Sequence, residues 1–258
     1  MKNAIAKILP IVVGVGLGLL LFYRPKGVGP AGPAGILIGL AVVFILLVGF
    51  IAFSISTSLP ADVSIRPLDG PIDPSVESLS REIKALGFEE AGGPFLVEIK
   101  PAAALAAFVH RTEPVYATVF RTGTVPSVTS YDFVSIFEGV PGGLTTTANW
   151  RGGALPAGPG EFRQIIADAG SRQVFEAHLE GLGWLKRHGV WAKNVSAATF
   201  VGDFKAALAH QRRNFVSAPV KTALIALGRT VSRRSPDFGL LAAQKGAEAR
   251  VRSLRPKL

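Results

Sequence analysis

Two long apolar segments near the N-terminus constrain this chain more than any other feature. Residues 4–23 and 34–57 are almost entirely hydrophobic, and the second segment contains no charged residue. A helix rises about 1.5 Å per residue, so about 20 residues cross the ~30 Å hydrocarbon core of a bilayer. The two segments therefore predict two membrane-spanning helices in an integral membrane protein.

The link between these segments, residues 24–33, is rich in proline and glycine, which interrupt regular structure. A link this short favours an antiparallel hairpin with both termini on one side. A cleaved signal peptide is the alternative for the first segment, but Phe22, Tyr23 and Arg24 form a poor cleavage context. Residues 27–32 also match a dinucleotide-binding pattern, yet no soluble strand precedes them, so no cofactor is expected.

Glycines four residues apart occur in both segments, as Gly14 and Gly18 and as Gly35 and Gly39. This spacing places each pair on one helix face, where two backbones can approach closely. It favours packing within the hairpin, with packing against another subunit or membrane protein as the alternative. No charge lies in the middle of either segment, which argues against a transporter or a channel.

Positive charge is concentrated in the C-terminal part of the chain. Residues 1–203 carry 16 Lys+Arg and 16 Asp+Glu, whereas residues 204–258 carry 12 Lys+Arg and only Asp237 and Glu248. Together with Lys2 and Lys7, this distribution favours cytoplasmic termini and a cytoplasmic domain. The high use of alanine, glycine, arginine and valine is typical of bacteria, so we expect the bacterial inner membrane.

Three further helices are predicted after the apolar segments. Asp73 can cap the first, because a proline suited to the first helical position follows it, and Gly87 ends that helix. Ser171 can cap the second helix, which Gly189 ends. The third is predicted over about residues 197–213.

Short strands are predicted between the first two of these helices. Branched and aromatic residues mark residues 95–99, 115–121, 128–138 and 144–148, while residues 102–109 are ambiguous between helix and strand. Short connections between consecutive strands predict an antiparallel β-meander. A sheet flanked in sequence by helices predicts an α+β fold.

The expected organisation has four parts. Residues 1–57 form the transmembrane hairpin and residues 58–72 a proline-containing juxtamembrane linker. Residues 73–215 form the soluble α+β domain, and residues 216–258 form a basic helical tail.

Few residues suggest chemistry. The chain has no cysteine, which excludes disulfides, thiolate catalysis and cysteine zinc sites. Its four histidines lack the spacing of a helical metal site, and His178 lies on an apolar helix face, as a hydrogen-bonded core histidine would. Asp132, inside an apolar strand, is expected to face solvent, with a buried carboxylate of raised pKa as the alternative. We therefore assign no metal, cofactor or catalytic residue.

The candidate partner- or ligand-binding segment lies between two glycine pairs, at residues 142–153. The alternative is a structural role, because threonines suit the solvent face of a strand and glycines suit hairpin ends. An enzymatic site would require Asp132, the threonines and Arg151 to converge in a pocket with a histidine. The candidate binding residues are Thr145, Thr146, Thr147, Asn149, Trp150 and Arg151.

The basic tail predicts an amphipathic helix near the membrane. Each cation close to an anionic headgroup layer contributes at most about 1 kcal/mol. A solvated tail or a docking segment for an acidic partner is the alternative, and nucleic acid is disfavoured because no recognition motif accompanies the charge. The candidate anionic-surface residues are Arg212, Arg213, Lys221, Arg229, Arg233, Arg234, Arg250, Arg252 and Arg255.

These features favour a membrane-anchored, non-enzymatic accessory or scaffold protein within a larger membrane complex. Its expected partners are the lipid bilayer, a protein partner or further copies of itself, and anionic lipid headgroups. A membrane-tethered enzyme of unknown reaction is one alternative. A binder of anionic lipid or nucleic acid through the basic tail is another.

Overall fold

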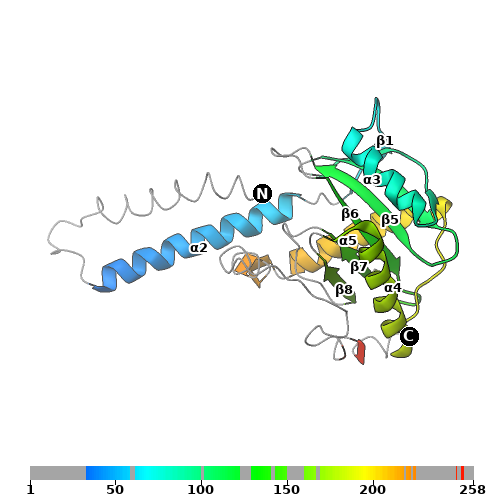
Figure 1. Cartoon of the computed structure of the whole chain (residues 1–258). Helices are drawn as coiled ribbons and strands as arrows, with labels where there is room; N and C mark the ends of the chain where they lie inside the picture. Colours follow the sequence, from blue (N-terminus) through cyan, green and yellow to red (C-terminus); the bar gives the residue numbers. More distant parts are fainter. Residues whose placement is uncertain are drawn as a thin grey trace.

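The protein was analysed as a computed structural model of the whole chain (Figure 1). The structure describes residues 33–58, 62–99, 102–122, 129–140, 143–149, 160–166, 169–217, 219–221, 223–224, 248 and 251–252. The first apolar segment, with Gly14 and Gly18, lies outside the described residues.

A mostly antiparallel sheet of eight strands forms the centre of the described part, and the fold is α+β. The strand order is β1-β3-β4-β5-β6-β7-β8, with β2 paired to β4 beside this path, and only the β7–β8 pair is parallel. The strands are β1 (Ile65–Pro67), β2 (Phe88–Glu90), β3 (Phe95–Val97), β4 (Ala103–His110), β5 (Tyr116–Thr122), β6 (Thr129–Ile136), β7 (Leu144–Ala148) and β8 (Glu161–Ile165).

Strand β4 resolves the ambiguous stretch of the sequence. It pairs with β2, β3 and β5, and side chains on both of its faces are buried. Alanine favours helices locally, so the strand state depends on these partners rather than on the residues of β4 themselves.

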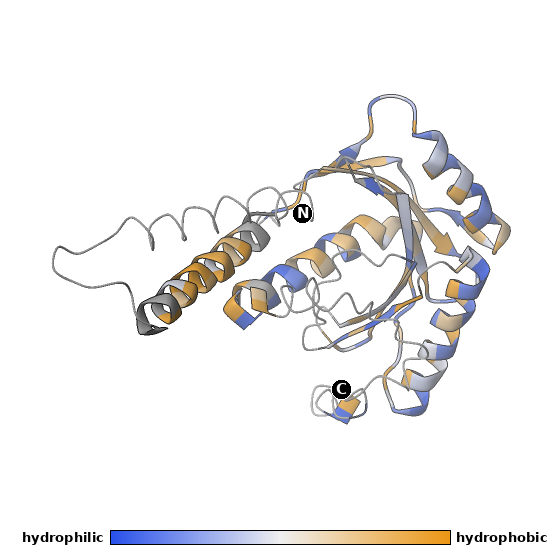
Figure 2. Ribbon diagram, turned by 60° about the vertical axis from the view of Figure 1, so that its left-hand side comes forward, coloured by the Kyte–Doolittle hydropathy of each residue, from blue (hydrophilic) through white to orange (hydrophobic). Residues whose placement is uncertain are grey.

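Helices α3 (Pro74–Ala85) and α4 (Ser171–Arg187) cover one face of the sheet. Their buried side chains, among them Ile83 and Phe175, pack with Phe108 and Phe133 of the sheet in one core cluster. Figure 2 shows the sheet curving away from these two helices. The alternation of β6 therefore places Tyr131, Phe133 and Ser135 on this face.

Helix α5 (Phe200–Ser217) lies against the other, concave face, after a short 3₁₀ turn at Ala197–Thr199 (Figure 2). Phe200 is buried against Tyr116 and Leu105, and Phe204 and Leu208 extend this contact along the helix. The predicted third helix is confirmed, because its apolar side meets the sheet.

The helix ends follow the sequence signals with one exception. Asp73 caps α3 by accepting a hydrogen bond from the Ser75 amide at 2.9 Å. Ser171 does not cap α4: Gly170 occupies that position, and the Ser171 hydroxyl donates instead to Glu82 at 3.0 Å. The reason is tertiary, since α3 and α4 lie on the same face and offer Ser171 a carboxylate.

Helix α2 (Pro33–Ser58) is a 26-residue helix that contains Gly35 and Gly39. Its inner side, at Val48 and Ile51, packs near α5 and Ala223. Among the described residues, no helix combines the length and the apolar character that crossing a membrane requires.

Three strands arise where none was predicted, and one of them is β2, which pairs with β4. The expected linker at residues 58–72 contains β1, which pairs with β3, so part of it belongs to the sheet. Strand β8 follows the Gly/Pro-rich stretch and pairs in parallel with β7. All three are short strands whose partners lie elsewhere in the chain, and local periodicity is a weak guide to such pairing.

Candidate functional site

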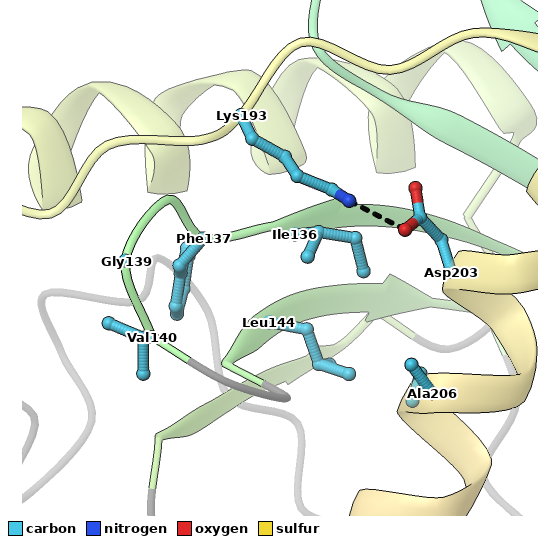
Figure 3. Close-up of a pocket in the computed structure, with 9 residues that line it drawn as sticks. Ile136, Phe137, Gly139, Val140, Leu144, Lys193, Asp203 and Ala206 are labelled. Carbon is cyan, nitrogen blue, oxygen red and sulfur yellow. Dashed lines mark hydrogen bonds and ion pairs between the residues drawn. The ribbon is translucent and has the colours of Figure 1, made fainter. Parts of the chain in front are cut away.

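A concavity in the described part lies between α5 and the turn that joins β6 to β7 (Figure 3). Its volume of about 330 Å³ falls at the lower end of the range typical of small-molecule pockets. The residues that line it are Ile136, Phe137, Gly139, Val140, Leu144, Lys193, Asp203, Ala206 and Ala207. We call this space the α5 cavity.

Two glycines shape the turn at the wall of the α5 cavity. Gly139 adopts a φ of +68°, which favours glycine. At Gly143 an added Cβ would lie 2.6 Å from Cγ1 of Val140 and 3.0 Å from Cδ2 of Phe137. Because Gly143 has no side chain, Val140 can pack against the Gly143 backbone while lining the cavity.

Small residues on α5 leave the space open. Ala206 faces it from the helix, opposite Ile136 and Leu144 of the sheet (Figure 3), and Ala207 also lines it. A larger residue at either alanine would occupy the volume that now separates helix and sheet. The cavity is therefore a consequence of two alanines at a point where α5 crosses the strands.

An ion pair forms the polar part of the wall. Lys193 Nζ lies 2.5 Å from Asp203 Oδ1, and the Tyr116 hydroxyl donates to Asp203 Oδ2 at 2.9 Å. Burial, together with the nearby Asp203 carboxylate, raises the pKa of Tyr116 to about 12, against the lowering effect of the Thr199 hydroxyl. At neutral pH the phenol is protonated and holds Asp203 toward Lys193.

A second polar group lies beside the cavity, further along α5. Glu161 on β8 is the register partner of Leu144 and is only 1% exposed. It accepts hydrogen bonds from Arg163 Nη2 at 2.9 Å and from Asn214 Nδ2 at 3.0 Å, with His210 Nε2 at 3.8 Å. The charge of this buried carboxylate is thus compensated within the fold.

Asp132 lies on the same face of the sheet and accepts a hydrogen bond from Thr118. Burial raises its pKa to about 6, against the lowering effects of the Thr118 hydroxyl and the positive charge of Arg163. Asp132 is intermediate in exposure, so it is neither fully exposed to solvent, as expected, nor fully buried, as in the alternative. The raised pKa supports the alternative of a partly desolvated carboxylate.

An exposed aromatic side chain, Trp191, precedes the cavity residue Lys193 by two positions. Trp191 is 51% exposed, and its ring lies 4.9 Å from Lys186 Nζ. Its carbonyl accepts a hydrogen bond from the Glu138 amide, and Ala192 forms a β-bridge with Phe137 of the cavity wall. These bonds fix the backbone of Trp191 at the cavity rim.

His178 belongs to a closed hydrogen-bond network under α4, on the opposite face. The Ser135 hydroxyl donates to the Pro114 carbonyl, so it accepts from His178 Nε2 at 3.0 Å. The Thr147 hydroxyl then donates to His178 Nδ1 at 2.9 Å and accepts from Gln164 Nε2 at 3.1 Å. Burial lowers the pKa of His178 to about 3. The expectation of a hydrogen-bonded core histidine is confirmed.

The candidate binding segment is divided between the two faces of β7. Thr145 and Thr147 are buried on the α4 side, whereas Thr146 points to the α5 side, as alternation requires. Asn149 Oδ1 accepts a hydrogen bond from the Tyr131 amide at 3.1 Å. Trp150 and Arg151 lie outside the described residues. Asp132 and His178 consequently occupy opposite faces and share no pocket.

The predicted cationic residues are only partly described. Arg213 and Lys221 are exposed, and Arg252 pairs with Glu248 at 3.9 Å. Arg212 lies in α5 and interacts with another residue of the protein. The other members lie outside the described residues: Arg229, Arg233, Arg234, Arg250 and Arg255.

The arrangement suits binding of an apolar group beside a fixed ion pair. Hydrophobic walls supply contact area, and Lys193 and Asp203 offer a polar end that can orient what enters. Within the described ranges, no group of three or more histidine or acidic side chains could hold a metal ion.

Comparison of the chain with protein-family models, with curated proteins and with solved structures finds no match.

Proposed function

We propose that this chain is a membrane-anchored, non-enzymatic accessory or scaffold protein that binds a protein partner in a larger complex of the bacterial inner membrane. The observation that carries the anchor is the apolar surface of α2 (Figure 2). Exposing so many large apolar side chains to water is unfavourable, whereas hydrocarbon accommodates them. The exposed ones are Leu37, Leu40, Val42, Phe44, Ile45, Leu46 and Phe53.

The full apolar stretch supports this proposal further. Several side chains of α2 lie outside the described residues. The sequence from residue 34 to residue 57 has no charge and exceeds the roughly 20 residues that a bilayer requires. With residues 4–23 it would form the proposed hairpin, and Lys2 and Lys7 favour cytoplasmic termini and a cytoplasmic domain.

Single cysteines test the anchor cleanly, because the chain has none of its own. In native membranes, a water-soluble maleimide should label Gln173→Cys, on the exposed side of α4, and should label Leu40→Cys only after the bilayer is dissolved. Equal labelling of both before detergent is added would contradict the anchor. Labelling of Gln173→Cys in inverted vesicles but not in intact cells is expected for a cytoplasmic domain.

The partner-binding part of the proposal is supported by the α5 cavity and Trp191. Exposed tryptophans next to apolar pockets dominate many protein interfaces, and charged groups at the rim contribute orientation. The Lys193–Asp203 pair lies in the cavity wall, and the backbone of the exposed Trp191 is hydrogen-bonded to Glu138 of the cavity turn, with its ring over Lys186 of α4.

Purification in mild detergent followed by native mass spectrometry tests partner binding. We expect a stoichiometric complex, with another protein or further copies of this chain, for the wild type and for the control Gln173→Ala. Trp191→Ala removes the exposed ring, and Ala206→Leu fills the cavity with a residue that helices favour. Both should lose the partner while remaining folded. A wild-type chain that is monomeric under all mild conditions would overturn the proposal.

A further inference from the structure

A row of exposed apolar side chains marks the end of α5 and the residues that follow. Val216, Val220 and Leu224 are 48%, 57% and 42% exposed. Residues 219–221 and 223–224 are also helical, and four-residue spacing places such side chains along one side of a helix. We call these three residues the apolar row.

Cationic side chains accompany the apolar row. Arg213 precedes Val216 by three residues, so helical spacing places it on the same side, and it is exposed. Lys221 is exposed beside Val220. An apolar stripe with flanking cations is typical of a helix that lies in a membrane interface, where long basic side chains reach the headgroups.

The apolar row is adjacent to helix α2. Ala223, between Val220 and Leu224, is fully buried in a cluster with Val48 and Ile51. Leu208 of α5 and Ile99 pack against the same cluster. The end of α5 is therefore attached to the side of the proposed anchor, not to its terminus (Figure 1).

The length of α2 sets the depth of this contact. About 20 residues cross the hydrocarbon, so every 20-residue span within Pro33–Ser58 includes Ile51. Between one and seven residues separate Ile51 from the domain-side end of such a span, which corresponds to at most about 10 Å. Ala223 and its neighbours consequently lie within about 10 Å of the level where acyl chains meet headgroups.

We infer that the apolar row, with Arg213 and Lys221, inserts into the interface of an anionic bilayer beside α2. This inference rests on the proposed membrane anchor and adds a second, shallow membrane contact to it. The contact would hold α5, and with it the α5 cavity, in a fixed position relative to the bilayer. Each cation near the anionic surface strengthens the contact modestly.

Depth-dependent quenching tests the inference on the full-length chain. Val220→Cys, at an exposed position, is labelled with an environment-sensitive fluorophore in vesicles of phosphatidylcholine and phosphatidylglycerol. Lipids that carry a nitroxide at a shallow or a deep acyl position serve as quenchers. Leu40→Cys is the matched site in the anchor, and Gln173→Cys is the matched site on α4.

We expect blue-shifted emission at Val220 with strongest quenching by the shallow nitroxide, strongest deep quenching at Leu40 and no quenching at Gln173. Unquenched emission at Val220 with a quenched Leu40 overturns the inference and leaves the anchor intact. Blue-shifted but unquenched emission at Val220 also overturns it, because a protein then covers the row. An unquenched Leu40 refutes the anchor and this inference together.

The charge contribution is tested by the double substitution Arg213→Gln and Lys221→Gln. Shallow quenching at Val220 should fall in anionic vesicles, and the difference from wild type should shrink in vesicles of phosphatidylcholine alone. Equal quenching of both chains in anionic vesicles would overturn the role of the cations. High salt should reduce the same difference, because it screens exposed charges.

Discussion

Lys193 and Asp203, ten residues apart in sequence, meet at 2.5 Å across the wall of the α5 cavity. Asp203 also accepts a hydrogen bond from Tyr116, so one carboxylate joins the segment before α5, the helix itself and strand β5. This carboxylate fixes the polar end of the only cavity that we assign to partner binding.

Removing that carboxylate should change the titration of Tyr116. Burial remains in Asp203→Asn, but the raising effects of the carboxylate disappear, so the pKa of Tyr116 should fall below about 12 and stay above its ordinary value of 10. NMR of chains labelled at the tyrosine ring measures this. Burial also raises the pKa of Tyr131 to about 12, and this residue serves as the internal control. An unchanged pKa of Tyr116 in Asp203→Asn would show that the Asp203 carboxylate does not raise it.

Asp132→Asn should remove part of the pH dependence of stability. The folded pKa of about 6 exceeds the ordinary aspartate value of 3.8, so the wild type loses stability as pH rises through this window, by about 2–3 kcal/mol in total. The asparagine variant should lose this slope and be at least as stable at neutral pH. Urea unfolding in detergent, followed by tryptophan fluorescence, provides the test. A slope equal to that of the wild type would refute the raised pKa.

His178 should remain neutral under mildly acidic conditions. Its folded pKa of about 3 lies below the ordinary histidine value of 6.5, so the unfolded chain takes up the proton first. This group therefore contributes stability above pH 6.5 that is lost as pH falls toward 3, by about 1.4 kcal/mol per unit. Nitrogen NMR should find the proton on Nε2 at pH 5. A proton on Nδ1 would contradict the direction of the network.

Substituting His178→Leu should be costly at neutral pH. The Ser135 hydroxyl would lose its donor and the Thr147 hydroxyl its acceptor, and a buried polar group left unpaired costs about 1–3 kcal/mol. The same urea experiment should show this loss together with a flatter acid slope. Wild-type stability in the variant would mean that the network contributes little.

Gly143→Ala should destabilise the cavity turn. The new Cβ would approach Val140 Cγ1 at 2.6 Å, and such overpacking typically costs about 1–3 kcal/mol. Gly202→Ala is the matched control, because it lies in α5 with nothing within 4 Å. The control should be stabilised by about 0.5–1 kcal/mol through helix propensity. Similar stability of the two variants would show that Val140 yields without cost.

Much of the helical and meander structure was predictable because its signals are local. Asp73 and Gly87 bracket α3 as expected, and β5, β6 and β7 form the predicted antiparallel neighbours. The state of β4 was not predictable, since its three partner strands lie elsewhere in the sequence. The α5 cavity and the role of Trp191 were missed, because no spacing pattern joins Trp191 to the turn after β6.

The sequence by itself determined the apolar length of α2, the positions of most helix ends and the alternation of β6 and β7, because each depends on residues a few positions apart. Only the tertiary structure decided what each face of that alternation meets. Two faces of a strand are equivalent until helices cover them: α4 buries Thr145 and Thr147 with His178, whereas α5 leaves Asp132 partly exposed beside Thr118. The His178 network is buried because α4 covers one face of the strands, whereas the other face, under α5, contains the α5 cavity.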